Sequence, residues 1–118
     1  MIGKKDDYPL LFHKSNKTKK SLIIKRKHAR KEAEKAAKIL KEKFGAEKVW
    51  LFGSLVQDDR FHDRSDIDLA ARGIPPEKFY KAFGVITREV TDFEIDLVDI
   101  DDCKEYLKEA IQKEGELI

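Results

Sequence analysis

The chain has 118 residues, of which 41% are hydrophobic and 41% are charged, and its formal net charge is +2. This length fits one domain with one core, and the composition favours a folded protein with a highly charged surface over a disordered chain. No apolar run approaches the ~20 residues that cross a bilayer, and the charged N-terminus does not resemble a signal peptide, so we expect a cytoplasmic protein without membrane contact.

The charges are distributed unevenly. Residues 1–31 carry eleven Lys or Arg against two acids, and residues 32–118 carry fourteen against twenty-one. Residues 1–20 lack sustained periodicity and predict a basic, flexible arm, followed by a single domain over residues 21–118. The arm could contact RNA or an acidic partner, but it lacks the interleaved aromatic residues of single-strand binders, so a solvated extension is favoured over nucleic-acid contact.

From about Ser21 the sequence predicts an amphipathic helix that ends at Gly45. Its apolar positions recur at steps of three and four: Ala29, Ala33, Ala36, Ala37, Leu40 and Phe44. Residues 48–52 form the next element, a strand so uniformly apolar that both of its faces should be covered.

A glycine-serine pair, Gly53 and Ser54, follows this strand, and one helical turn and a polar, acidic loop should come next. Residues 66–71 then predict a second strand. Because strand side chains alternate between faces, Asp66 and Asp68 point the same way, while Ile67 between them points into the core.

The rest of the chain predicts a helix, a third strand and a last helix. The first helix opens after Gly73 and two prolines, with the apolar stripe Phe79, Phe83, Ile86 and Val90. In the third strand, residues 93–99, Asp96 lies on the face opposite its apolar neighbours. Asp102 and Glu105 have the spacing of a capping box for the last helix. Its expected buried side is Tyr106, Leu107, Ala110 and Ile111.

This order predicts an α/β (α+β) fold in which a small mixed sheet is packed by helices. Each motif alone is weak evidence for a functional site, because a lone pair of aspartates can simply be solvated and Gly-Ser turns are common. Their combination is more specific. Further acids before Asp66 would repel one another unless a cation such as Mg²⁺ neutralised them, and Gly53 allows close approach of a phosphate.

The motifs resemble the minimal nucleotidyltransferases (MNT) of the DNA polymerase beta-like superfamily. They are Leu-Phe-Gly-Ser at residues 51–54, Ser-Asp-Ile-Asp-Leu at 65–69 and Ile-Asp-Leu-Val at 95–98, and the resemblance covers about residues 44–118. It implies roles for six residues. Nucleotide binding is implied for Gly53, Ser54 and Ser65, and binding of two Mg²⁺ ions and catalysis for Asp66, Asp68 and Asp96.

The resemblance also implies a partner. Family members of this size are typically antitoxins paired with a HEPN-domain ribonuclease toxin, and some transfer AMP from ATP to a tyrosine of that toxin. The alternative is a catalytically weak or inactive antitoxin that neutralises the toxin by binding alone. The small catalytic core independently favours an acceptor presented by another macromolecule. Many relatives carry an arginine shortly after the glycine-serine pair, where this chain has Val56-Gln57-Asp58, so Arg60 and Arg64 are the candidate substitutes.

Overall fold

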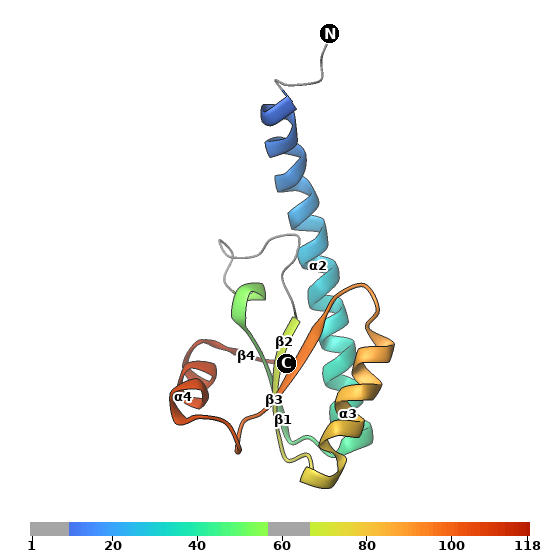
Figure 1. Ribbon diagram of the computed structural model, residues 1–118, viewed down its shortest axis with the longest axis vertical. Coiled ribbons are helices and arrows are strands. Elements are labelled where there is room, and N and C mark those ends of the chain that lie inside the picture. Colours follow the sequence, from blue (N-terminus) through green and yellow to red (C-terminus); the bar gives the residue numbers. More distant parts are fainter. Residues whose placement is uncertain (1–9, 57–66) are drawn as a thin grey trace.

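The computed structural model describes residues 10–56 and 67–118, with side chains from Lys20 onward in the first range. Within these ranges, three helices and a four-stranded mixed sheet form an α+β fold, as the sequence predicts (Figure 1). The helices are α2 (Leu10–Phe44), α3 (Pro76–Glu89) and α4 (Glu105–Glu114). The strands are β1 (Lys48–Phe52), β2 (Ile67–Arg72), β3 (Ile95–Asp99) and β4 (Glu116–Leu117).

Helix α2 is longer than the sequence predicts. It begins at Leu10, so the expected start near Ser21 is wrong, and residues 10–20 of the predicted arm are helical. No proline or glycine lies between Pro9 and Gly45 to interrupt the helix. Its N-terminal part extends beyond the end of the sheet (Figure 1). The helix ends as expected, at Gly45, which has a φ of +78°.

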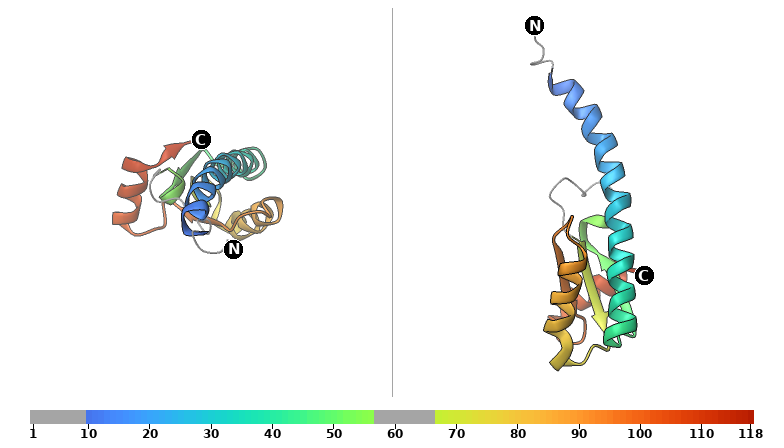
Figure 2. Two further views of the ribbon diagram at one scale, coloured as in Figure 1. Left: turned by 90° about the horizontal axis from the view of Figure 1, so that it is seen from above. Right: turned by 90° about the vertical axis from the view of Figure 1, so that its right-hand side faces the viewer.

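The sheet has the order β3-β2-β1-β4. Strand β1 has the predicted bounds and pairs antiparallel with both β2 and β4, whereas β2 and β3 pair in parallel. The short strand β4 is absent from the sequence-based prediction. Helices α2 and α3 cover one face of the sheet and α4 covers the other (Figure 2). Both faces of β1 are therefore buried, as expected from its apolar sequence.

Two groups of buried side chains lie on opposite faces of the sheet. The larger group joins α2 and α3 to alternate residues of the strands, including Leu51, Ile67 and Leu69. The smaller group joins α4 to the other face through Trp50 and Ile111. Alternation along the strands thus divides the side chains between two helical layers.

The prediction for α4 is wrong in two respects. The helix begins at Glu105 after Lys104, without a side-chain cap, so the predicted capping box of Asp102 and Glu105 does not form. Tyr106 is 71% exposed, and Ala110 is exposed as well, because the helix contacts the sheet along a narrower stripe than expected. In the described ranges, no helix is both long and apolar enough to cross a membrane.

Alanines on α2 allow this helix to lie close to the sheet. Ala29, Ala33 and Ala36 are fully buried at helical spacing. We expect Ala33→Leu to lower the free energy of unfolding by about 1–3 kcal/mol, because the larger side chain would push α2 away from the strands. Urea unfolding measures this loss. Glu34→Leu, at an exposed neighbouring position, is the matched control, and an equal loss in both variants would contradict close packing at Ala33.

Candidate functional site

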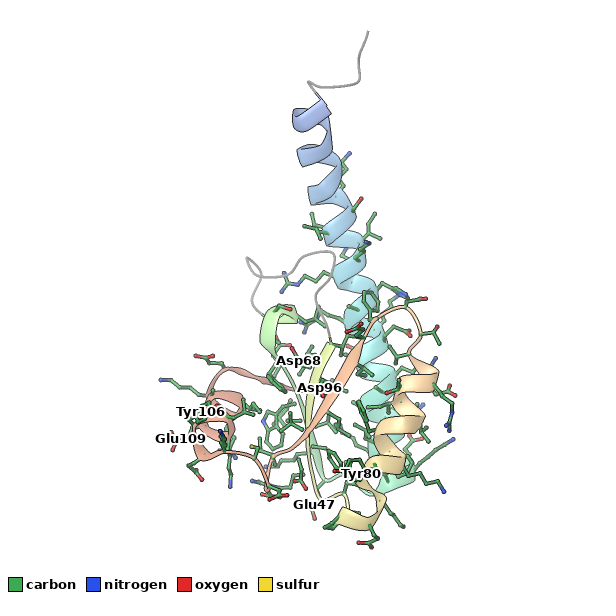
Figure 3. All side chains as sticks on the ribbon, in the orientation of Figure 1. Glu47, Asp68, Tyr80, Asp96, Tyr106 and Glu109 are labelled. Carbon is green, nitrogen blue, oxygen red and sulfur yellow. The ribbon has the colours of Figure 1, made fainter. Side chains whose placement is uncertain are left out.

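Two of the three predicted acidic residues lie side by side at one end of the sheet. The register pairs Phe52 of β1 with Asp68 of β2, and Asp68 with Asp96 of β3. Since paired residues of neighbouring strands point to the same face, the three side chains form one row. Figure 3 places Asp68 and Asp96 together at the strand ends. Asp68 is half-buried and Asp96 is exposed, so a ligand can reach both carboxylates.

The start of β3 is fixed by contacts from two other elements. The amide N–H of Ile67 donates a hydrogen bond of 2.9 Å to the carbonyl oxygen of Glu94, which extends the pairing of β2 with β3. His28 of α2 lies 2.8 Å from a carboxylate oxygen of Asp92, and its ring packs against Phe93. These contacts hold the segment before β3, and therefore Asp96, against the neighbouring strand.

The glycine-serine turn lies directly beside Asp68. Gly53 has a φ of +78°, and residues Gly53–Leu55 form the short 3-10 helix η1, which confirms the expected helical turn. A Cβ atom at Gly53 would overlap Oδ2 of Asp68 and lie 3.2 Å from its Cγ. Only glycine therefore satisfies both the backbone conformation and the close approach of Asp68. The turn and the acidic row form one continuous site.

Two contacts hold this turn on the body of the protein. The side chain of Leu55 is fully buried in the core between the sheet and α2. Its carbonyl oxygen accepts a hydrogen bond of 3.1 Å from Nη2 of Arg26, on α2. Sequence reasoning missed Arg26, which precedes the turn by more than twenty residues. The available signal was its helical spacing of three residues from Ala29, on the buried face of α2.

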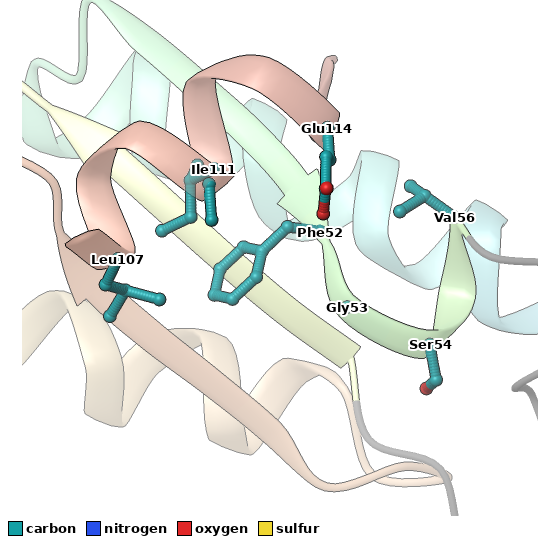
Figure 4. Close-up of a pocket in the computed structure, with 8 residues that line it drawn as sticks. Phe52, Gly53, Ser54, Val56, Leu107, Ile111 and Glu114 are labelled. Carbon is teal, nitrogen blue, oxygen red and sulfur yellow. The ribbon is translucent and has the colours of Figure 1, made fainter.

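A pocket of about 370 Å³ opens between the turn and α4 (Figure 4). Its lining consists of Phe52, Gly53, Ser54, Val56, Leu107, Ala110, Ile111 and Glu114. Phe52 and the α4 side chains make the wall mainly apolar, while Ser54 and Glu114 supply polar groups. Phe52 lines this pocket and is also paired in register with Asp68. The pocket therefore lies next to the carboxylates of Asp68 and Asp96.

The remaining predicted site residues lie outside the described residues. They are Ser65 and Asp66, together with Arg60 and Arg64, the candidate substitutes for the missing arginine. Within the described part of the chain, no group of three or more His, Cys, Asp or Glu residues could hold a metal ion. The pair that is described, Asp68 and Asp96, does fit Mg²⁺ in chemistry, because carboxylate oxygens are the hard ligands that this ion prefers.

Cys103, in the loop before α4, does not contribute to this site. Burial raises the pKa of its thiol, and its Sγ lies 3.6 Å from the carbonyl oxygen of Ile100, toward which it can donate. The thiol is therefore protonated at neutral pH, the form in which cysteine is a poor nucleophile.

A mixed sheet with a glycine-serine turn after β1 and paired aspartates on β2 and β3 defines a nucleotidyltransferase fold. Residues 34–118 match the family model described as "Polymerase beta, Nucleotidyltransferase". This match spans well over half of the chain, so the protein belongs to the polymerase beta nucleotidyltransferase family. A comparison with curated protein sequences gives no significant match.

Solved structures with the same fold come from toxin–antitoxin complexes. A chain of a toxin–antitoxin crystallised with AMP-PNP is 24% identical, with a TM-score of 0.61, over 72% of this chain and 70% of that one. A chain of the toxin–antitoxin MntA-HepT is 20% identical, with a TM-score of 0.56, over 75% of this chain and 69% of that one. A chain from a complex of tri-AMPylated Shewanella oneidensis HEPN toxin with MNT antitoxin is 19% identical, with a TM-score of 0.57. The match covers 75% of this chain and 70% of that one.

Proposed function

We propose that this protein is an antitoxin that transfers AMP from ATP to a tyrosine hydroxyl of a HEPN ribonuclease toxin and thereby neutralises it. The observation that carries the proposal is the contact of Gly53 with Asp68, which lies in register with Asp96. The turn can accept a triphosphate at the place where two carboxylates can hold cations. Membership of the nucleotidyltransferase family supports the same chemistry.

The structural relatives support the choice of partner and nucleotide. One contains the ATP analogue AMP-PNP, and another pairs an MNT antitoxin with an AMPylated HEPN toxin. The compact body of this chain adds an independent reason. Among the described residues, the pocket is lined by the end of β1, the turn with Val56, and α4, so a second macromolecule would have to supply a further wall around a reacting hydroxyl.

In the proposed reaction, the tyrosine oxygen forms a bond to the α-phosphorus of ATP as the bond to the bridging oxygen of the β-phosphate breaks. Pyrophosphate leaves, and the hydroxyl proton passes to Asp96 or to solvent. Gly53 and Ser54 would bind the triphosphate, and Asp66 and Asp68 would hold Mg²⁺. Asp96 would either complete the metal site or accept the hydroxyl proton. Magnesium bound there would lower the pKa of the attacking hydroxyl and neutralise charge on the pyrophosphate.

The test first asks whether an adjacent gene encodes a HEPN protein. The purified chain is then mixed with that protein, ATP and Mg²⁺, and both proteins are weighed by mass spectrometry. We expect the mass of the HEPN protein to rise by one or more AMP units, and its ribonuclease activity to fall in parallel. EDTA should prevent both changes. A HEPN protein that is neutralised without a change in mass would instead support the alternative, an antitoxin that acts by binding alone.

A further inference from the structure

We propose that Arg26 is a triphosphate-binding residue, supplied to the site by helix α2. This inference rests on the proposed function, since it assigns a further residue to the same nucleotide site. Its starting point is the 3.1 Å hydrogen bond from Nη2 of Arg26 to the carbonyl oxygen of Leu55, in a partly buried environment. Leu55 is the last residue of the turn that begins at Gly53, so the guanidinium group lies at the turn itself.

The packing of α2 explains how Arg26 reaches this position. It precedes Ala29 by three residues and Ala33 by seven, so all three lie on one face of the helix. Both alanines are fully buried against the sheet, and their small size lets the helix lie close to it. The same face continues past the end of the sheet, where the turn is located. Close packing of α2 therefore brings Arg26 to the turn.

The chemistry of the site calls for a fixed cation at this place. The carboxyl groups of Asp68 and Asp96 lie in register, and a triphosphate bound at the turn would bring several negative charges beside them. In the sequence, the four residues directly after the turn, Val56-Gln57-Asp58-Asp59, include no basic residue. A guanidinium group is permanently charged and carries five N–H donors, so it can bond a carbonyl oxygen and a phosphate together. Arg26 thus supplies a cation to the turn from a helix that precedes it by more than twenty residues.

Titration calorimetry on the whole chain tests this role, with Mg²⁺–ATP and AMP as separate ligands. We expect Arg26→Ala to weaken ATP binding about 10- to 100-fold, the usual effect of losing charge-assisted hydrogen bonds. AMP lacks the β- and γ-phosphates, so its affinity should fall by no more than about twofold. Arg26→Lys should lose less than Arg26→Ala, because the ammonium group keeps the charge.

Lys27→Ala provides the matched control, because it removes an exposed cation from the next position of the same helix. ATP binding by this variant should stay within about twofold of the wild type. Equal weakening of ATP and AMP in Arg26→Ala would overturn the inference, since it would indicate a purely structural role, and so would unchanged ATP affinity. A wild-type chain that binds neither ligand would overturn the proposed function as well, so the two failures can be told apart.

Discussion

In the proposed transfer of AMP to a HEPN toxin, replacing Asp68 by asparagine should reduce the rate by about 10²- to 10⁴-fold, equivalent to roughly 3–5 kcal/mol of transition-state stabilisation. Asn has nearly the same shape, but it lacks the negative charge that a divalent cation requires. Asp68 touches the turn at Gly53 and lies in register with Asp96, so its charge serves both halves of the site. Transfer of label from α-labelled ATP to the partner measures the effect.

The controls for this prediction separate chemistry from folding. Asp102→Asn removes an exposed carboxylate of the loop before α4 and should leave transfer unchanged. The free energy of unfolding of Asp68→Asn should stay within about 1 kcal/mol of the wild type, because the substitution changes little in shape. The complex with the toxin should still form. Transfer at the wild-type rate in Asp68→Asn would show that the carboxylate is not needed for the reaction.

The strands and their faces could be predicted from the sequence because local rules decide them. Alternation placed Ile67 and Leu69 in the core and Asp68 on the opposite face, and both apolar side chains are fully buried. The register of Asp68 with Asp96 requires in addition that β2 and β3 be neighbours. Periodicity cannot predict which strands are neighbours in the sheet. The similarity of the motifs to a known family did predict that Asp68 and Asp96 come together.

The features that the sequence-based reasoning missed depend on tertiary contacts. The N-terminal part of α2 extends beyond the end of the sheet, and only the absence of helix breakers could have predicted that it is helical. Strand β4 is two residues long and exists because its register with Trp50 and Leu51 completes the sheet edge. Arg26 meets the turn only because α2 packs closely on the strands. Local patterns give at most partial signals for these features, because each contact joins segments that are far apart in the sequence.

The contact of the turn with Asp68 makes a second large effect predictable, for Gly53→Ala. Both Gly45 and Gly53 have a φ of +78°, but only at Gly53 does a Cβ atom meet another group, the carboxylate of Asp68. Gly45→Ala should therefore cost only the backbone strain of about 1–2 kcal/mol and leave transfer intact. Gly53→Ala should cost a further 1–3 kcal/mol or so for overpacking and should abolish transfer, because Asp68 must move.

Chemical unfolding of the two glycine variants, together with the double variant Gly53→Ala/Asp68→Ala, isolates the contact. Removing the Asp68 carboxylate takes away the overlap, so in that background Gly53→Ala should cost no more than Gly45→Ala does in the wild type. Transfer should remain absent in the double variant, because the carboxylate proposed to bind the metal is gone. An equal loss of stability on Gly53→Ala in the wild type and in the Asp68→Ala background would contradict the contact. The turn at Gly53 and the carboxylate of Asp68 would then be independent of each other.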